Sequence, residues 1–234
     1  MDRKEIVKVL GEHIGIKPKY LGVPSFAYQV GEYTVDREGR IRNKVGDEVE
    51  LEDILNSEKK TTDLMIALPM EGHSGKTLRN LVNMIYSRQV MIKKVFEIEE
   101  NIVEGYFITA INHMDVQTTS QFIYILKELG VENCRGINFE EDKITFNITK
   151  QEIEPEEVKA FADFLSLLNK KAKELKYASD KQVNTDNEKY AFRTWLMRLG
   201  MIGDEYKDTR KVLLQNLSGN GAFRKPGESN EAKM

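Results

Sequence analysis

The residues whose types and spacing could do chemistry lie in one turn, residues 70–77, with the sequence M-E-G-H-S-G-K-T. A short apolar run at residues 64–68 precedes the turn, and one amphipathic helical pattern follows it over residues 75–95. A buried strand, a glycine-containing turn and a helix starting at Gly-Lys-Thr form the layout of a phosphate-binding loop. The candidate ligand-binding residues are therefore Gly72, His73, Gly75, Lys76, Thr77 and Arg79.

The motif is degenerate, and a purely structural turn is the alternative interpretation. Met70 occupies the position of the first motif glycine, where the backbone needs conformations that a Cβ disfavours. In the structural interpretation, Gly72 and Gly75 adopt conformations that a side chain would strain. Ser74 then caps the following helix, and Lys76 lies in solvent on its first turn.

The other reactive residue types form no catalytic or metal-binding pattern. His13, His73 and His113 have no partners at metal-ligand spacing, and Cys134 has no base beside it in the sequence. A nucleotide hydrolase also needs a second apolar strand ending in aspartate. The nearest candidate, Asp115, follows a stretch whose periodicity predicts a helix. We therefore predict no catalytic residue, no metal and no cofactor.

The C-terminal region carries a local excess of positive charge. Residues 189–225 contain eight Lys or Arg against three Asp or Glu, a local net charge of +5. Together with nearby aromatic residues, this excess is typical of a nucleic-acid surface. The alternative is that Tyr190, Phe192 and Trp195, which have helical spacing, form a docking face. The candidate nucleic-acid residues are Arg193, Arg198, Arg210, Lys211 and Arg224.

The helix that follows the turn carries polar residues whose role is open. Its apolar residues fall on one stripe, and Arg79 and Asn83 lie one turn apart away from that stripe. These two side chains could jointly contact a ligand near the helix start. The alternative is a polar face in solvent.

Alternating and periodic apolar patterns predict the remaining elements. They indicate helices over residues 3–14, 101–114, 118–129 and 155–175, and a three-stranded meander within residues 26–41. Residues 137–148 have the clearest hairpin pattern, and residues 190–199 and 206–217 form two further helices. The predicted fold is α+β, with a small antiparallel sheet (the meander, the hairpin and one central strand) covered by helices, and a C-terminal helical hairpin.

The expected domain organisation follows breaks in composition. Residues 1–62 form an N-terminal helix and meander unit, and residues 63–177 form the central α+β core. A polar, aperiodic stretch then leads to the C-terminal helical hairpin at residues 188–217. Residues 218–234, rich in glycine, asparagine and charge, are expected to be a disordered tail.

The composition predicts a soluble cytoplasmic protein. Its 234 residues are 40% hydrophobic and 31% charged, enough for a sizeable core, and the formal net charge is −3. This balance argues against a nucleic-acid footprint over the whole chain. The single cysteine is typical of a reducing compartment. No apolar run approaches membrane-spanning length, so we expect no membrane partner.

Two stretches resemble a known group of proteins. The sequence LPMEGHSGKTLRN, beginning at Leu68, and residues 191–224 resemble uncharacterised proteins carried on conjugative elements and prophages of Gram-positive bacteria. These proteins are often labelled "virulence-related". The resemblance includes residues 20–40 and implies a mobile-element context, but it implies no activity and no functional residues.

These observations predict a non-enzymatic, macromolecule-binding accessory protein of a mobile genetic element. An inhibitor of a host defence system would be one instance. The expected partner is a protein of host or element origin, and nucleic acid is the alternative partner through the C-terminal helices. The alternative function is a nucleotide- or phosphate-binding protein that uses a degenerate phosphate loop at residues 70–77.

Overall fold

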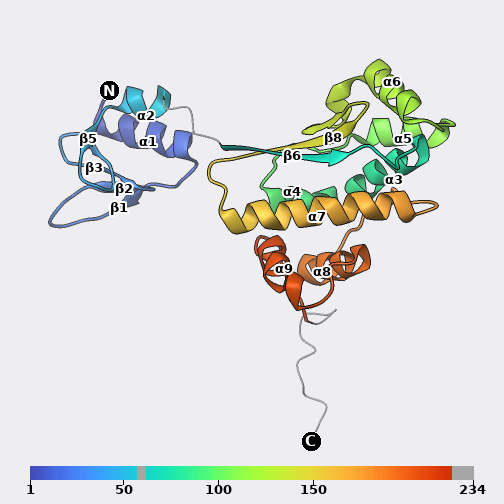
Figure 1. Ribbon diagram of the computed structural model, residues 1–234. Coiled ribbons are helices and arrows are strands. Elements are labelled where there is room, and N and C mark those ends of the chain that lie inside the picture. Colours follow the sequence, from blue (N-terminus) through green and yellow to red (C-terminus); the bar gives the residue numbers. More distant parts are fainter. Residues whose placement is uncertain (57–61, 223–234) are drawn as a thin grey trace, which may run out of the picture. The chain divides into compact units, whose positions relative to one another are not determined.

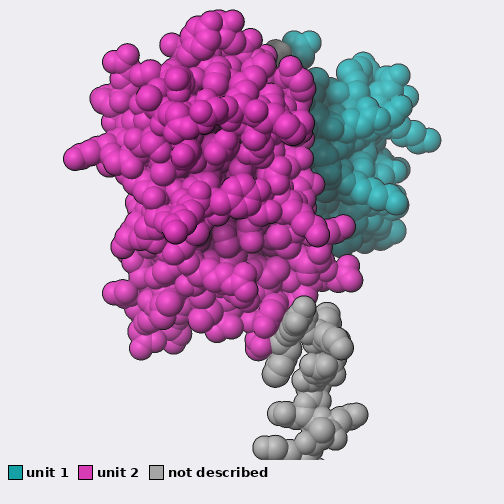
Figure 2. Space-filling model, turned by 90° about the vertical axis from the view of Figure 1, so that its right-hand side faces the viewer, with its two compact units in different colours: residues 1–61 teal, residues 62–234 magenta. Residues whose placement is uncertain are grey.

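The computed structural model describes residues 1–56 and 62–222 of the chain. These residues belong to two compact units, residues 1–61 and residues 62–234, which we call unit 1 and unit 2 (Figure 2). Each unit has its own cluster of buried apolar side chains.

Unit 1 is a five-stranded antiparallel meander with two helices. Helix α1 (Arg3–Ile14) begins at a capping box formed by Asp2 and Glu5, and it ends at Gly15, whose left-handed φ of 72° favours glycine. Three strands match the predicted meander, and two-residue strands extend it at both edges. The strands are β1 (Lys19–Tyr20), β2 (Tyr28–Val30), β3 (Tyr33–Val35), β4 (Ile41–Arg42) and β5 (Glu48–Val49), followed by α2 (Leu51–Asn56).

The sheet of unit 2 has three antiparallel strands in the order β6-β8-β7. They are β6 (Thr62–Pro69), β7 (Ile137–Phe139) and β8 (Lys143–Lys150). The predicted hairpin is confirmed as β7 and β8. The apolar run before the turn forms β6, which pairs with β8 along its whole length and lies at an edge of the sheet. The meander and the hairpin therefore belong to two different sheets.

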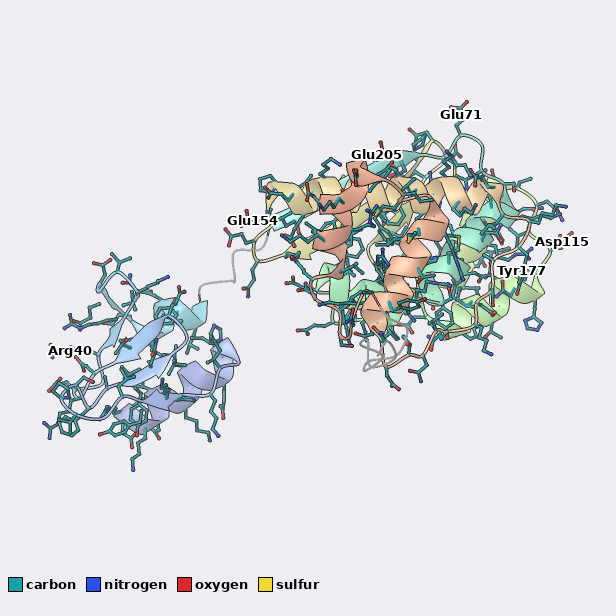
Figure 3. All side chains as sticks on the ribbon, turned by 90° about the horizontal axis from the view of Figure 1, so that it is seen from below. Arg40, Glu71, Asp115, Glu154, Tyr177 and Glu205 are labelled. Carbon is teal, nitrogen blue, oxygen red and sulfur yellow. The ribbon has the colours of Figure 1, made fainter. Side chains whose placement is uncertain are left out.

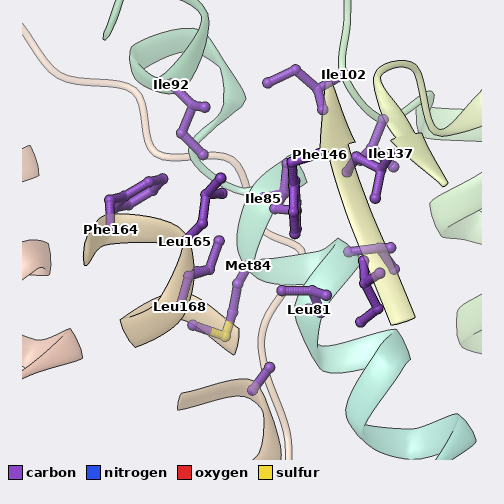
Figure 4. Close-up of a cluster of buried hydrophobic side chains, with 14 of the residues drawn as sticks. Leu81, Met84, Ile85, Ile92, Ile102, Ile137, Phe146, Phe164, Leu165 and Leu168 are labelled. Atoms are coloured by element: carbon purple, nitrogen blue, oxygen red, sulfur yellow. The ribbon is translucent and has the colours of Figure 1, made fainter. Parts of the chain in front are cut away.

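Helices cover the sheet of unit 2 and then one another. In Figure 1, α3, α4 and α7 lie beneath β6 and β8, and α8 and α9 lie beyond α7. Side chains from α3, α7 and β8, including Ile85, Leu165 and Phe146, meet in the core (Figure 4). The helices are α3 (Gly75–Tyr86), α4 (Gln89–Phe96), α5 (Gly105–His113), α6 (Thr119–Leu129), α7 (Pro155–Glu174), α8 (Glu188–Leu199) and α9 (Lys207–Leu214), with single 3₁₀ turns at Val131–Asn133 and Asp204–Tyr206.

The C-terminal helices share the core of unit 2. Phe192 and Trp195 of α8 are buried, and their ring centroids lie 5.9 and 5.6 Å from that of Phe164 on α7. The aromatic residues of α8 at helical spacing therefore include a docking face, as one interpretation predicted. Residues 218–222, at the start of the expected tail, contact α8 through hydrogen bonds, and residues 223–234 lie outside the described part of the chain.

The single long helix predicted over residues 75–95 is wrong, because the structure divides it into α3 and α4. The Ser87 carbonyl accepts a hydrogen bond from the Val183 N–H, and the Met91 N–H bonds to Arg88. A distant segment therefore takes the acceptor that the helical ladder would use. The α+β class is confirmed. Among the described helices, none is both long and apolar enough to cross a membrane.

Candidate functional site

The turn at residues 70–77 is a capped helix start. Ser74 is the N-cap of α3, as predicted, and its hydroxyl accepts a hydrogen bond from the Thr77 N–H. The Thr77 hydroxyl in turn accepts from the Ser74 N–H at 2.8 Å, which completes a capping box. The two residues therefore satisfy each other at the position where a phosphate loop would bind its ligand.

Two further N–H groups of the turn are also bonded within the chain. The His73 N–H donates to the Met70 carbonyl, and the Gly75 N–H donates to the Gln117 carbonyl, each at 3.0 Å. Lys76 is exposed on the first turn of α3. A phosphate cradle needs such N–H groups to point at the ligand, so this geometry is that of a strand-to-helix junction.

The two glycines of the turn are required for different reasons. Gly72 has a φ of +78°, a left-handed conformation that a side chain would strain, as predicted. The same prediction for Gly75 is wrong, because Gly75 is the first residue of α3 and lacks a positive φ. A Cβ on Gly75 would lie 2.6 Å from the Val116 carbonyl oxygen. Close packing against the α5–α6 connection therefore explains this glycine.

His73 connects the turn to α7. Its Nδ1 lies 2.9 Å from the Thr77 hydroxyl, and its Nε2 lies 2.7 Å from Oδ1 of Asn169. Burial lowers the pKa of His73 from 6.5 to about 4; the bond to Asn169 opposes this shift, and the charge of Lys173 adds to it. The Lys173 ammonium also donates to the Glu71 carbonyl at 2.6 Å. His73 is therefore neutral at pH 7 and holds two elements together.

Arg79 and Asn83 do not act together. Arg79 donates to the Met114 carbonyl at the end of α5, whereas Asn83 is fully buried. The Asn83 amide donates to the Ala178 carbonyl and exchanges hydrogen bonds with Asn112. Both interpretations of Asn83, a ligand contact and a residue in solvent, are therefore wrong.

The aspartate and the cysteine considered for chemistry have no reactive setting. Asp115 is exposed after α5, a helix as predicted, and Figure 3 shows its side chain at the surface. Cys134 is buried, and burial raises the pKa of its thiol. In the part of the chain that the structure describes, no three His, Cys, Asp or Glu side chains are grouped as a metal site.

Among the candidate nucleic-acid residues that the structure describes, Arg193 and Arg198 lie on different sides of α8. Arg193 donates to the Gly221 carbonyl, and Arg210 donates to the Met201 and Gly203 carbonyls of the α8–α9 connection. Arg198 lines a pocket on the other side of α8 from Arg193, since the two are about 140° apart on a helix. Lys211 is exposed on α9. Arg224 lies outside the described residues.

Sequence reasoning missed an exposed apolar segment in unit 1, because two prolines marked residues 17–24 as a loop. Strand β1 is the edge of the meander, and four large apolar side chains lie on or beside it. Their exposed fractions are 46% for Ile16, 52% for Tyr20, 41% for Leu21 and 77% for Val23. We call these four residues the edge patch. The signal available in the sequence was the density of apolar residues in a loop.

A basic groove adjoins the start of this segment. It has a volume of about 490 Å³ and includes Ile16 of the edge patch. Three lysines and one glutamate line it, so the charge of the groove is positive. Apolar side chains complete the lining. The charged residues are Lys4, Lys8, Lys17 and Glu12, and the apolar ones include Val7, Pro18 and Tyr28.

In comparisons with known proteins, no family model, no curated protein and no solved structure matches this chain.

Proposed function

We propose that this protein is a non-enzymatic, macromolecule-binding accessory protein, and that unit 1 docks on a protein partner through the edge patch. The observation that carries the proposal is the exposure of Ile16, Tyr20, Leu21 and Val23 within one eight-residue segment. Single exposed apolar residues are ordinary, but several together are typical of protein interaction sites.

The chemistry of the surface indicates the type of partner. Tyr20 packs against Tyr28 in a tilted arrangement with ring centroids 4.9 Å apart, which positions its side chain before binding. A positioned, exposed tyrosine is a common centre of binding energy in protein interfaces. Strand β1 has only two residues, so side chains contribute more to docking than backbone pairing does. The lysines of the groove favour a partner segment that carries acidic residues.

The resemblance to proteins of conjugative elements and prophages supports a partner of host or element origin. In this proposal the protein acts by occupying its partner, and an inhibitor of a host defence system is one instance. Nucleotide binding at residues 70–77 has less support, because the chain itself bonds the N–H groups of His73, Ser74, Gly75 and Thr77.

Site-specific photo-crosslinking in a Gram-positive host tests the proposal. A photoreactive amino acid replaces Tyr20 in the full-length protein, and a matched variant carries it at Val45. Val45 is 86% exposed and lies in the turn between β4 and β5. We expect one protein to crosslink at Tyr20 and not at Val45.

The double substitution Leu21→Ser and Val23→Ser should abolish that crosslink while leaving thermal stability nearly unchanged, because both side chains are exposed. Equal labelling at positions 20 and 45, or a crosslink only between two copies of this chain, would reject a dedicated partner site on unit 1.

A further inference from the structure

A second surface, on unit 2, combines two arginines with two aromatic residues. It is a pocket of about 510 Å³ bounded by the start of α4, the segment before α8 and one face of α8. We call it the arginine pocket. Its lining includes Arg88, Thr185, Tyr190, Thr194, Trp195 and Arg198.

Its two arginines lack counter-charges. No aspartate or glutamate lines the pocket, and neither Arg88 nor Arg198 forms an ion pair with any described residue. The buried cation elsewhere in unit 2 differs, because the Lys150 ammonium lies 2.7 Å from Glu157 and 2.9 Å from Glu97. Charges that are withdrawn from water are normally paired. The half-buried Arg88 has no charged partner among the described residues and donates to one side-chain hydroxyl only, which suggests a ligand.

The structure holds the Arg88 guanidinium in a fixed position. Its central carbon lies 4.8 Å from the centroid of the Trp195 ring, and Nη1 donates to the Ser87 hydroxyl at 2.8 Å. A guanidinium has five N–H donors, and among the described residues only this side-chain acceptor engages it. Burial, and then the positive charge of Arg198, lowers the pKa of Arg88 from its ordinary value. An anion between the two arginines would relieve their repulsion.

We propose that the arginine pocket binds a nucleotide unit, with its phosphate between Arg88 and Arg198 and its base against Tyr190. Guanidinium groups bind phosphate oxygens through charge-assisted, paired hydrogen bonds. The hydroxyls of Thr185 and Thr194 supply further donors along the lining. Tyr190 is half-buried, so part of its side chain is open to a base, and aromatic rings are common stacking platforms for single-stranded nucleic acid.

The aromatic lining favours a nucleotide over a phosphorylated peptide. A phosphate alone needs only the arginines and hydroxyls, whereas the half-buried ring of Tyr190 offers a flat partner for a base. The volume also falls in the range of small-ligand sites, roughly 300–1,000 Å³. Either a free mononucleotide or one unit of a single strand has this chemistry.

The chain offers a local readout for the test. Trp195 is its single tryptophan and lies in the pocket against Arg88, so its fluorescence reports occupancy directly. The full-length protein is titrated with thymidine monophosphate, a short thymidine oligonucleotide, inorganic phosphate and a phosphotyrosine peptide. We expect saturable quenching by the mononucleotide, the oligonucleotide or both, and weaker binding of inorganic phosphate. Which of the two binds more tightly identifies the source of the nucleotide unit.

Arg198→Gln is the decisive variant, because Arg198 is exposed and its loss leaves the Arg88–Trp195 stack in place. It should weaken binding about tenfold to a hundredfold, as expected for a charge-assisted hydrogen bond. Arg193→Gln, on the same helix but outside the pocket, should change affinity less than about twofold.

Three results would overturn the proposal. The first is that neither nucleotide ligand quenches the fluorescence at millimolar concentration. The second is that Arg198→Gln and Arg193→Gln lose nucleotide affinity equally. The third is that the phosphopeptide binds more tightly than both nucleotide ligands. The Leu21→Ser, Val23→Ser variant of unit 1 should bind nucleotide like the unmodified protein, so this proposal and the docking of unit 1 fail independently.

Discussion

The turn at residues 70–77 and the arginine pocket are two polar regions of unit 2. They differ in how far their hydrogen-bond donors have partners within the chain. In the turn, four backbone N–H groups have partners within the chain, and His73 is bonded at both ring nitrogens. In the pocket, two arginines face a cavity without a carboxylate. The region that carries a motif is internally satisfied, and the region without one is not. The arginines of the pocket therefore keep donors for a ligand, whereas these four N–H groups of the turn do not.

The largest expected effect concerns the buried cation Lys150, which is paired with carboxylates, in contrast to Arg88 of the arginine pocket. Glu157→Ala removes the closest partner of Lys150, and both residues are more than nine-tenths buried. It should lower the free energy of unfolding by about 3–5 kcal/mol, because a charge stays buried with less compensation. Chemical denaturation measures the loss, and Glu156→Ala on the same turn, where the side chain is exposed, is the control. Equal losses of stability in the two variants would contradict a stabilising role of the Lys150–Glu157 ion pair.

The second prediction tests whether the turn is a structural junction. Gly75→Ala should destabilise the fold by about 1–3 kcal/mol, because the added methyl group meets the backbone of Val116. Gly72→Ala should cost about 1–2 kcal/mol through its left-handed backbone. Thermal unfolding of both variants, with Gly46→Ala as a comparison in unit 1, measures these losses. A silent Gly75→Ala would mean that α3 does not pack as closely on Val116 as described.

His73 gives the turn a pH dependence. The unfolded chain binds its imidazole proton near pH 6.5 and the folded chain only near pH 4. The unfolded state therefore holds more protons between these values, and the free energy of unfolding falls as the pH drops from 6.5 to 4. Urea unfolding at pH 7, 5.5 and 4.5 should show this decline, and His73→Gln should flatten it. His13→Gln, on α1 of unit 1, serves as the matched control, and identical pH slopes in all three proteins would refute the prediction.

The smallest effects are expected for exposed cations of both regions. Lys76→Ala and Arg198→Gln should each change the free energy of unfolding by less than about 0.5 kcal/mol, because both side chains are exposed and neither has an ion-pair partner among the described residues. Calorimetric titration with a mononucleotide then distinguishes the two variants by their affinity. Lys76→Ala should leave binding unchanged, and Arg198→Gln should weaken it. Weaker binding by Lys76→Ala together with unchanged binding by Arg198→Gln would restore the phosphate-loop interpretation.

Local signals predicted much of the fold correctly. The cap at Ser74 and the helix predicted over residues 118–129 could be read from the sequence, because both depend on hydrogen bonds or conformations within a few residues. The hairpin of β7 and β8 and the long helix α7 follow from periodicity in the same way. Such features need no knowledge of distant parts of the chain.

The polar residues of α3 were beyond this kind of inference. Asn80 and Asn83 fall off the apolar stripe, as solvent-facing residues do, yet both are buried beneath the segment that follows α7. Asn80 accepts a hydrogen bond from the Ala178 N–H and donates to the Leu175 carbonyl. A buried asparagine is stable only when such partners are present, and these partners lie far along the chain.

The arginine pocket shows most clearly the difference between features that depend on neighbouring residues and features that depend on distant ones. One interpretation of the sequence placed Trp195 on the docking face of a helix, which is compatible with the structure, but no local pattern links Trp195 to Arg88. Their contact lies at the break between α3 and α4, where the Ser87 carbonyl accepts a hydrogen bond from the distant Val183 N–H. Local hydrogen bonds and periodicity determine where elements begin and end, whereas the meeting of two distant side chains depends on the packing of the whole unit.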